Sequence, residues 1–180
     1  MPVTKDRERR GGAEETAMER KGTKGSAVVT LPLDTEILIT RDFDAPKHLV
    51  YRAWTTPELV RRWWHANLGE MTLVEMDVRV GGHWRWVMVT SEGGMEVAFH
   101  GEYREVVPNE KLVFTEVYEG YPDAGALTTI TLTEKDGRTR MTSLTQHQTK
   151  EHRDGHINSG MESGMQVAMD LMEEVAISLE

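Results

Sequence analysis

A change in hydrophobic periodicity near residue 148 constrains the fold of this chain more than any other feature of its sequence. Between residues 71 and 147 apolar and polar residues alternate with a period of two, which is typical of strands. From about Thr149 to Leu179 apolar residues recur every three or four positions, which is typical of one face of a helix. The members of this stripe are Ile157, Met161, Met165, Ala168, Met172, Val175 and Leu179. We therefore expect a long C-terminal helix that buries this stripe against one face of a sheet.

The alternating region divides into short segments that turn residues separate. We expect strands at residues 35–43, 71–80, 83–91, 95–107, 111–118, 127–134 and 138–147. Sequences such as Gly81-Gly82 and Lys135-Asp136-Gly137, which lie between them, are typical of tight turns. Because gaps this short connect antiparallel neighbours, the pattern predicts an antiparallel sheet of about six to seven strands.

Two short helices are expected after the first strand. Pro46 precedes a helical pattern over residues 47–55, and Pro57 suits the first turn of a second helix. The order of elements predicts an α+β fold of the helix-grip type, in which a curved antiparallel sheet wraps around the long C-terminal helix. The first half of that helix contains three glycines that weaken it and favour a bend. They are Gly155, Gly160 and Gly164.

Composition bounds the domain organisation and the compartment. Residues 1–27 are rich in charged residues and glycine and poor in apolar ones, which predicts a disordered tail before one domain over residues 28–180. The start of the chain lacks the apolar core of a secretory signal. The sequence also contains no run of about eighteen apolar residues, which a membrane-spanning helix would need. We therefore expect a cytoplasmic protein without a membrane partner.

Charge and cysteine content exclude several classes of function. The formal net charge is −9 at pH 7, and a field of that sign opposes binding to the phosphates of nucleic acids. The chain contains no cysteine, so disulfides, thiolate nucleophiles and cysteine metal ligands are ruled out. We expect no nucleic-acid partner, no catalytic nucleophile and no cofactor.

Four segments resemble a known family. They are ITRDFDAPKHLVYRAWTTPELVRRWW (Ile39 to Trp64), DVRVGGHWRW (Asp77 to Trp86), FHGEYREVVPNEKLVFTE (Phe99 to Glu116) and the stretch from Asp136 to Met165. In this order they resemble the START-like superfamily, also called Bet v 1-like or SRPBCC. Within it the chain looks like the branch named for the activator of Hsp90 ATPase. The resemblance implies a cavity between the sheet and the long helix, and it covers carriers, co-chaperones and enzymes, so it does not select one function.

Strand alternation and the helix stripe indicate which side chains face such a cavity. Large aromatic rings beside flexible methionines are suited to an adaptable apolar pocket, although the same residues could simply fill a core. The predicted ligand-binding residues are Trp63, Trp64, Trp84, Trp86, Met88, His100, Phe114, Glu116, Tyr118, Met161 and Met165.

Glu116 is the most informative polar residue of this set. A buried carboxylate must be paired or neutralised, so we expect it to contact His100 or Arg85 and to orient a ligand. Alternation points His100 outward, unless a bulge turns it. A second polar group, His147, His152 and His156, contains two histidines at a helical spacing that metal sites use, but its polar, glycine-broken context argues against a metal.

Three functions remain open. A small-ligand-binding protein would have an internal cavity, and its partner would be a small apolar molecule. A protein-interaction module, as the resemblance to the Hsp90 activator implies, would have a filled interior and an exposed patch. An enzyme such as a cyclase or hydrolase would need an acid–base pair, for which Glu116 and His100 are the candidates. Either a monomer or a homodimer is compatible with the sequence.

Overall fold

A computed structural model describes residues 23–180, and the first 22 residues lie outside the described part. Most of the predicted tail falls on those first residues, so the predicted domain boundary stays a prediction. The helices and strands are β1 (Val28–Thr30), β2 (Glu36–Phe43), α1 (Lys47–Thr55), α2 (Pro57–Val60), β3 (Gly69–Met76), β4 (His83–Thr90), β5 (Glu96–Val107), β6 (Lys111–Tyr118), β7 (Ala126–Lys135), β8 (Arg138–His147), α3 (Lys150–Ile157) and α4 (Met161–Ile177).

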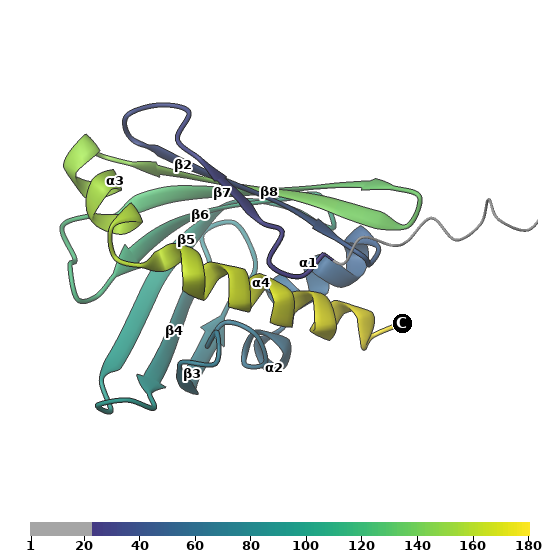
Figure 1. Cartoon of the computed structure of the whole chain (residues 1–180), viewed down its shortest axis with the longest axis horizontal. Helices are drawn as coiled ribbons and strands as arrows, with labels where there is room; N and C mark the ends of the chain where they lie inside the picture. Colours follow the sequence, from purple (N-terminus) through teal and green to yellow (C-terminus); the bar gives the residue numbers. More distant parts are fainter. Residues whose placement is uncertain (1–22) are drawn as a thin grey trace, which may run out of the picture.

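The strands form one curved antiparallel sheet in the order β1-β2-β8-β7-β6-β5-β4-β3. The register shifts between Met71 and Leu73 in β3 and between Tyr103 and Glu105 in β5. Irregularities of this kind bend a sheet locally. Figure 1 shows β3 and β4 turned steeply away from β7 and β8, so the sheet curves around α4.

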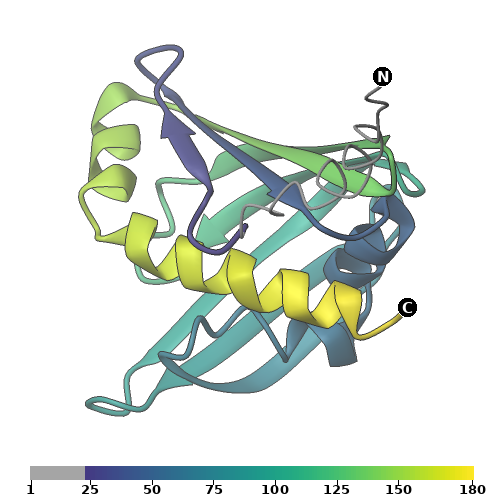
Figure 2. The same ribbon diagram turned by 45° about the vertical axis from the view of Figure 1, so that its right-hand side comes forward.

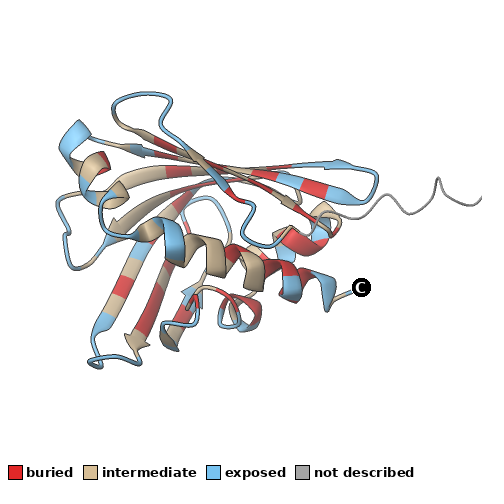
Figure 3. Ribbon diagram, in the orientation of Figure 1, coloured by how far each residue is buried: buried red, intermediate tan, exposed pale blue. Residues whose placement is uncertain are grey.

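Helix α4 crosses the concave face of this sheet (Figures 1 and 2). The residues of α4 that are buried all lie in its second half: Met169, Met172, Glu173, Val175 and Ala176. In the first half, from Met161 to Ala168, every residue is half-buried or exposed (Figure 3). Helix α1 packs against α4 near the C-terminal end of α4. The helix is thus buried in the core in its second half and packs against it with only partly buried side chains in its first half.

The predicted helix-grip architecture is confirmed, with two differences of detail. The sheet has eight strands because the segment Val28–Thr30 also pairs with β2. This segment is too short to show any periodicity in the sequence. The long C-terminal helix is divided into α3 and α4 at Gly160, whose φ of 81° lies in the left-handed region that favours glycine. Among residues 23–180 no helix combines the length and apolar character needed to cross a membrane, and the cytoplasmic location stays a prediction.

A buried ion cluster ties the second half of α4 to strand β2. The Arg41 side chain is fully buried, and its Nη1 lies 2.7 Å from Asp170 Oδ1 while its Nη2 lies 3.5 Å from Glu173 Oε1. The other oxygen of Glu173 accepts a hydrogen bond from the backbone N–H of Asp44 at 2.8 Å. The guanidinium also lies 5.3 Å from the ring centroid of Phe43. Each buried charge therefore has partners, which is the condition under which burial is tolerated.

The segment before β2 reinforces this attachment. The backbone N–H of Gly25 donates to Asp170 Oδ1 at 2.8 Å. The Gln166 amide accepts from the backbone N–H of Ala27 at 3.1 Å and donates to the carbonyl of the same residue at 2.7 Å. Ala27 itself is buried. This segment, which continues into edge strand β1, therefore runs along α4 and hydrogen-bonds to it.

We expect Arg41→Met to lower the free energy of unfolding by about 3–5 kcal/mol, because it leaves the buried Glu173 and the half-buried Asp170 without their cation. Urea unfolding followed by far-UV circular dichroism measures this loss. Arg140→Met is the matched control, since Arg140 binds Asp42 at 2.8 and 2.9 Å on an exposed part of the same strand pair and exposed pairs contribute little. A loss for Arg41→Met as small as that of the control would contradict the role of the cluster.

Candidate functional site

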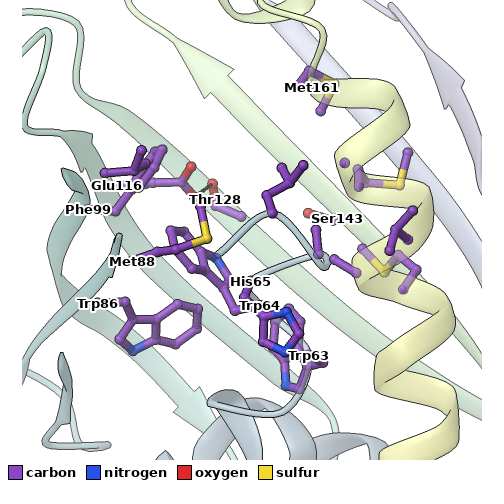
Figure 4. A pocket seen from close by; sticks show the side chains of 18 of the residues that line it. Trp63, Trp64, His65, Trp86, Met88, Phe99, Glu116, Thr128, Ser143 and Met161 are labelled. Carbon is purple, nitrogen blue, oxygen red and sulfur yellow. Dashed lines mark hydrogen bonds between the residues drawn. The ribbon is translucent and has the colours of Figure 1, made fainter. Parts of the chain in front are cut away.

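A cavity with a volume of about 650 Å³ lies between the concave face of the sheet and the first half of α4. It lies beside the part of α4 whose side chains are only partly buried. The walls come from β4 to β8 on one side, from α4 on the other, and from the segment after α2 at one end (Figure 4). Most of the lining side chains are aromatic, aliphatic or methionine, so the cavity is predominantly apolar.

Tryptophans form the floor at the α1–α2 end of the cavity. The ring centroids of Trp84 and Trp86 lie 5.0 Å apart, and Trp63 and Trp64 approach Trp86 edge-on at 6.0 and 5.7 Å. The Trp63 and Trp84 indole N–H groups donate to backbone carbonyls at 2.9 and 3.2 Å, which fixes both rings. Edge-to-face pairs of this kind are favourable beyond the area they bury. This floor is therefore a rigid aromatic surface.

The opening of the cavity lies where lining residues are exposed. Leu68 precedes β3 and is 55% exposed. Met95 immediately precedes β5 and is 59% exposed. Opposite them, Ser159, Gly160 and Ser163 at the junction of α3 and α4 are also exposed. A Cβ placed on Gly164 would lie 3.8 Å from Leu68 Cδ1, so the loop and the helix meet here.

A small polar cluster lies on the sheet wall of the otherwise apolar cavity. Thr128 Oγ1 donates to Glu116 Oε2 at 3.2 Å and also lies 3.2 Å from Thr145 Oγ1 (Figure 4). Burial raises the pKa of the Glu116 carboxyl above its ordinary value near 4.5, and the hydrogen bond from Thr128 opposes that rise. Ser143 adds a buried hydroxyl to the same wall. The cavity thus offers one carboxyl group and several hydroxyls to a ligand.

The expected pairing of Glu116 with His100 or Arg85 is wrong. Arg85 donates to Glu119 at 2.7 and 3.0 Å, and His100 Nδ1 lies 3.0 Å from Glu119 Oε1. Arg85 pairs with His100 in the register, and His100 pairs with Val117. Directly paired residues share a face of the sheet, so the side chains of Arg85, His100 and Val117 are all on its outer face. Because alternation puts Glu116 on the inner face, the sheet itself separates it from these partners.

All of the predicted ligand-binding residues except His100 and Tyr118 line the cavity. His100 is on the outer face, as strand alternation indicated, and no bulge turns it inward. Tyr118 is on the inner face but beyond the cavity, where its ring lies 5.1 Å from that of Phe99 and is 39% exposed. Their binding roles remain predictions, and for these two the geometry gives no contact with the cavity.

Glu116 was predicted from the sequence, but the hydroxyl residues beside it and part of the aromatic wall were not. Thr128 shares a strand face with Ile130 and Leu132, and Ser143 and Thr145 share one with Met141. That i, i+2 spacing was the available signal, but small hydroxyl residues in a strand read equally well as ordinary strand formers. The other lining residues that were not predicted include Ile39, Trp54, His65, Ala66, Leu68, Met95, Val97, Phe99, Leu112 and His156.

The histidines near α3 form a pair rather than a metal site. His147 Nε2 lies 3.0 Å from His156 Nδ1, and burial together with the neighbouring histidines lowers the pKa of His147 to about 4. Burial also lowers the pKa of His156. His152 instead packs edge-on against Tyr121, with ring centroids 5.8 Å apart. In the described part of the chain no group of three or more histidine or carboxylate side chains is arranged to hold a metal ion.

Comparison with known proteins gives a family and a fold. Residues 44–176 match the family described as Activator of Hsp90 ATPase homolog 1-like protein. A crystal structure from Rhodobacter sphaeroides is 24% identical, with a TM-score of 0.78, and the match covers 84% of this chain and 99% of that one.

Two further solved structures have the same fold. A protein from Nitrosomonas europaea is 25% identical, with a TM-score of 0.74, over 83% of this chain and 98% of that one. One from Mycobacterium smegmatis is 24% identical, with a TM-score of 0.73, over 82% and 95%. No curated protein sequence matches the chain. These three structures share the fold of this chain.

Two glutamates three residues apart are expected to affect stability with opposite signs. Hydrogen bonds from Arg85 and His100 hold the pKa of Glu119 at about 2, so its charge stabilises the fold above pH 4.5 and loses that effect as the pH falls toward 2. The raised pKa of Glu116 means that its contribution is present below pH 4.5 and is lost as the pH rises.

At pH 7.5 we therefore expect Glu119→Gln to lower the urea midpoint and Glu116→Gln to leave it unchanged or raise it. Glutamine can still accept the hydrogen bond from Thr128, so the second substitution removes only the charge. Paired unfolding curves at pH 4.5 and pH 7.5 should show the advantage of Glu116→Gln growing with pH. A loss for Glu116→Gln at pH 7.5 equal to that of Glu119→Gln would rule out the buried position of Glu116.

Proposed function

We propose, from the premise that this chain belongs to the family of activator of Hsp90 ATPase homolog 1-like proteins, that it binds a small apolar molecule between the sheet and α4. The observation that carries this proposal is the cavity of about 650 Å³. Ligand pockets commonly span about 300–1,000 Å³ and combine apolar walls with a few polar groups. A core that was simply filled would leave no void of this size, because protein interiors are close-packed.

The arrangement of the walls supports binding of a ligand that varies in shape. The aromatic floor around Trp86 is fixed by ring packing, whereas Met88, Met161 and Met165 contribute flexible side chains around it. Methionine adapts its rotamers at low cost, so the roof and side wall can adjust to an occupant. Half of α4 forms that roof without being buried in the core, which gives the roof freedom to move.

An enzyme with Glu116 and His100 as its acid–base pair is not supported. The two residues lie on opposite faces of the sheet, so they cannot act on one substrate. Binding without chemistry needs only the cavity and its polar wall, and we therefore favour it.

Filling the cavity tests the proposal. We expect Ala168→Phe, on the half-buried face of α4 that lines the cavity, to weaken binding of the fluorescent probe N-phenyl-1-naphthylamine by at least about tenfold, because a ring would occupy the binding volume. Glu174→Phe is the control, since Glu174 lies on the exposed face of the same helix. Probe titration measures both, with circular dichroism to check folding. Equal affinity for Ala168→Phe and wild type would exclude this cavity as the site.

A second candidate function is binding to a protein. Edge strand β1 and the turn after it carry three exposed apolar side chains, Val28, Leu31 and Leu33, at 57%, 47% and 62% exposure. Exposed apolar residues beside an unpaired strand edge favour association with another chain. The name of the family suggests Hsp90 as the partner to test.

If this second role holds, the protein will raise the ATPase rate of Hsp90, and the double substitution Leu31→Glu, Leu33→Glu will abolish the increase. Ala168→Phe should leave the increase intact, because it alters only the cavity. A steady-state ATPase assay distinguishes the two surfaces. An unchanged Hsp90 rate on addition of wild-type protein would dismiss this candidate and leave the cavity proposal untouched.

A further inference from the structure

We propose that the molecule bound in the cavity is an organic cation, with an amine or ammonium group held at Glu116 and an apolar body against the aromatic wall. This inference rests on the proposed ligand-binding function and names the chemical class of the ligand. It depends on the charge of the cavity, on where the neighbouring cations are, and on the chemistry of the rings.

The lining of the cavity contains a carboxyl group without a lysine or arginine partner. Burial alone disfavours the charged form of that group, and a cation beside it would favour the charged form. Glu116 is its carboxylate, and no lysine or arginine is among the lining residues, all of which belong to residues 23–180. The side chain receives a hydrogen bond from Thr128, a neutral donor at 3.2 Å. Two histidines also line the cavity, and burial lowers the pKa of His156, which favours its neutral form. His65 Nδ1 accepts a hydrogen bond from the backbone N–H of Asn67 at 2.9 Å, so that nitrogen carries no proton. A ligand cation would supply the missing charge.

Two arginines on nearby strands form ion pairs with carboxylates outside the cavity. Arg85, on β4, is on the outer face and binds Glu119 through both Nε and Nη2. Arg41, on β2, is bound to Asp170 and Glu173 beneath the second half of α4. Neither can reach the cavity without breaking these contacts. Among residues 23–180, therefore, the carboxyl group of Glu116 has a hydroxyl as its hydrogen-bond donor and no lysine or arginine beside it in the cavity lining.

The aromatic walls complement a cation. The faces of tryptophan and phenylalanine rings attract ammonium groups, most strongly where water is excluded. Phe99 lies next to Glu116 in Figure 4, and its ring packs edge-on against Trp64 at 5.4 Å. Phe114 precedes Glu116 by two positions on the same strand face and packs edge-on against Trp84 at 5.6 Å. An ammonium group at the carboxylate would thus be surrounded by rings.

The same charge disfavours the opposite ligand class. A fatty acid in this cavity would bring a second carboxylate into an apolar space that holds no cation to neutralise it. A long-chain alcohol avoids this repulsion and can donate one hydrogen bond to Glu116, but it adds no charge. The cavity therefore ranks ligands of one shape in the order amine, alcohol, carboxylate.

Three probes with the same decyl chain test this order: decylamine, 1-decanol and decanoate. We expect displacement of N-phenyl-1-naphthylamine from the full-length protein at pH 7.5 to give decylamine an affinity at least about tenfold above that of 1-decanol, because hydrogen bonds to charged groups exceed neutral ones. Decanoate should bind weakest. Glu116→Gln should reduce decylamine to the affinity of 1-decanol while leaving 1-decanol unchanged, and Glu119→Gln, which removes an outer carboxylate, should change neither.

The outcomes separate this inference from the function on which it rests. If 1-decanol binds in competition with the fluorescent probe but decylamine has no advantage over it, the cation proposal fails and apolar binding stands. The same holds if Glu116→Gln leaves the decylamine advantage intact, or if Glu119→Gln removes it. If none of the three chains displaces the probe, the proposed binding function fails as well.

Discussion

The buried contact between Arg41 and the two carboxylates of α4 is the interaction on which the rest of this structure depends. It fixes the second half of the helix against β2, with Asp170 and Glu173 on adjacent turns of the helix and the guanidinium over the ring of Phe43. A buried ion cluster has strict geometry, because any displacement exposes an unpaired charge to an apolar surrounding. The helix is therefore held at one end with a defined direction across the sheet.

The consequence of this one-ended attachment is the cavity. Beyond Ala168 toward the N-terminus, α4 carries no buried residue, and Gly160 ends that half with a change of chain direction. The sheet meanwhile curves away at β3 and β4. One of its two register shifts lies in β3 and the other in β5, the strand next to β4. A straight helix over a curved sheet cannot contact it along its whole length, so a space opens where the two diverge. Aromatic rings fill only the end of that space.

Strand alternation then divides the chemistry between two faces. On β6 and the residue just after it, Glu116 faces the cavity and Glu119 faces outward, where Arg85 forms an ion pair with it and His100 Nδ1 lies 3.0 Å from its Oε1. The same side-chain type thus has a raised pKa on one face and a lowered pKa on the other. The sheet thus separates the carboxyl group on its inner face from the arginine on its outer face.

The sequence by itself determined the periods of the elements, and with them the helix-grip fold and the inward direction of Trp84, Trp86, Phe114, Met161 and Met165, because periodicity is a local property of the chain. It could not determine that Glu116 is beside Thr128 and not beside Arg85, since that depends on the register between strands and on which face each partner occupies. Nor could it reveal the clearance under the first half of α4. That clearance exists because the ion cluster at Arg41 joins residues that lie 129 and 132 positions apart, and only tertiary structure brings them together.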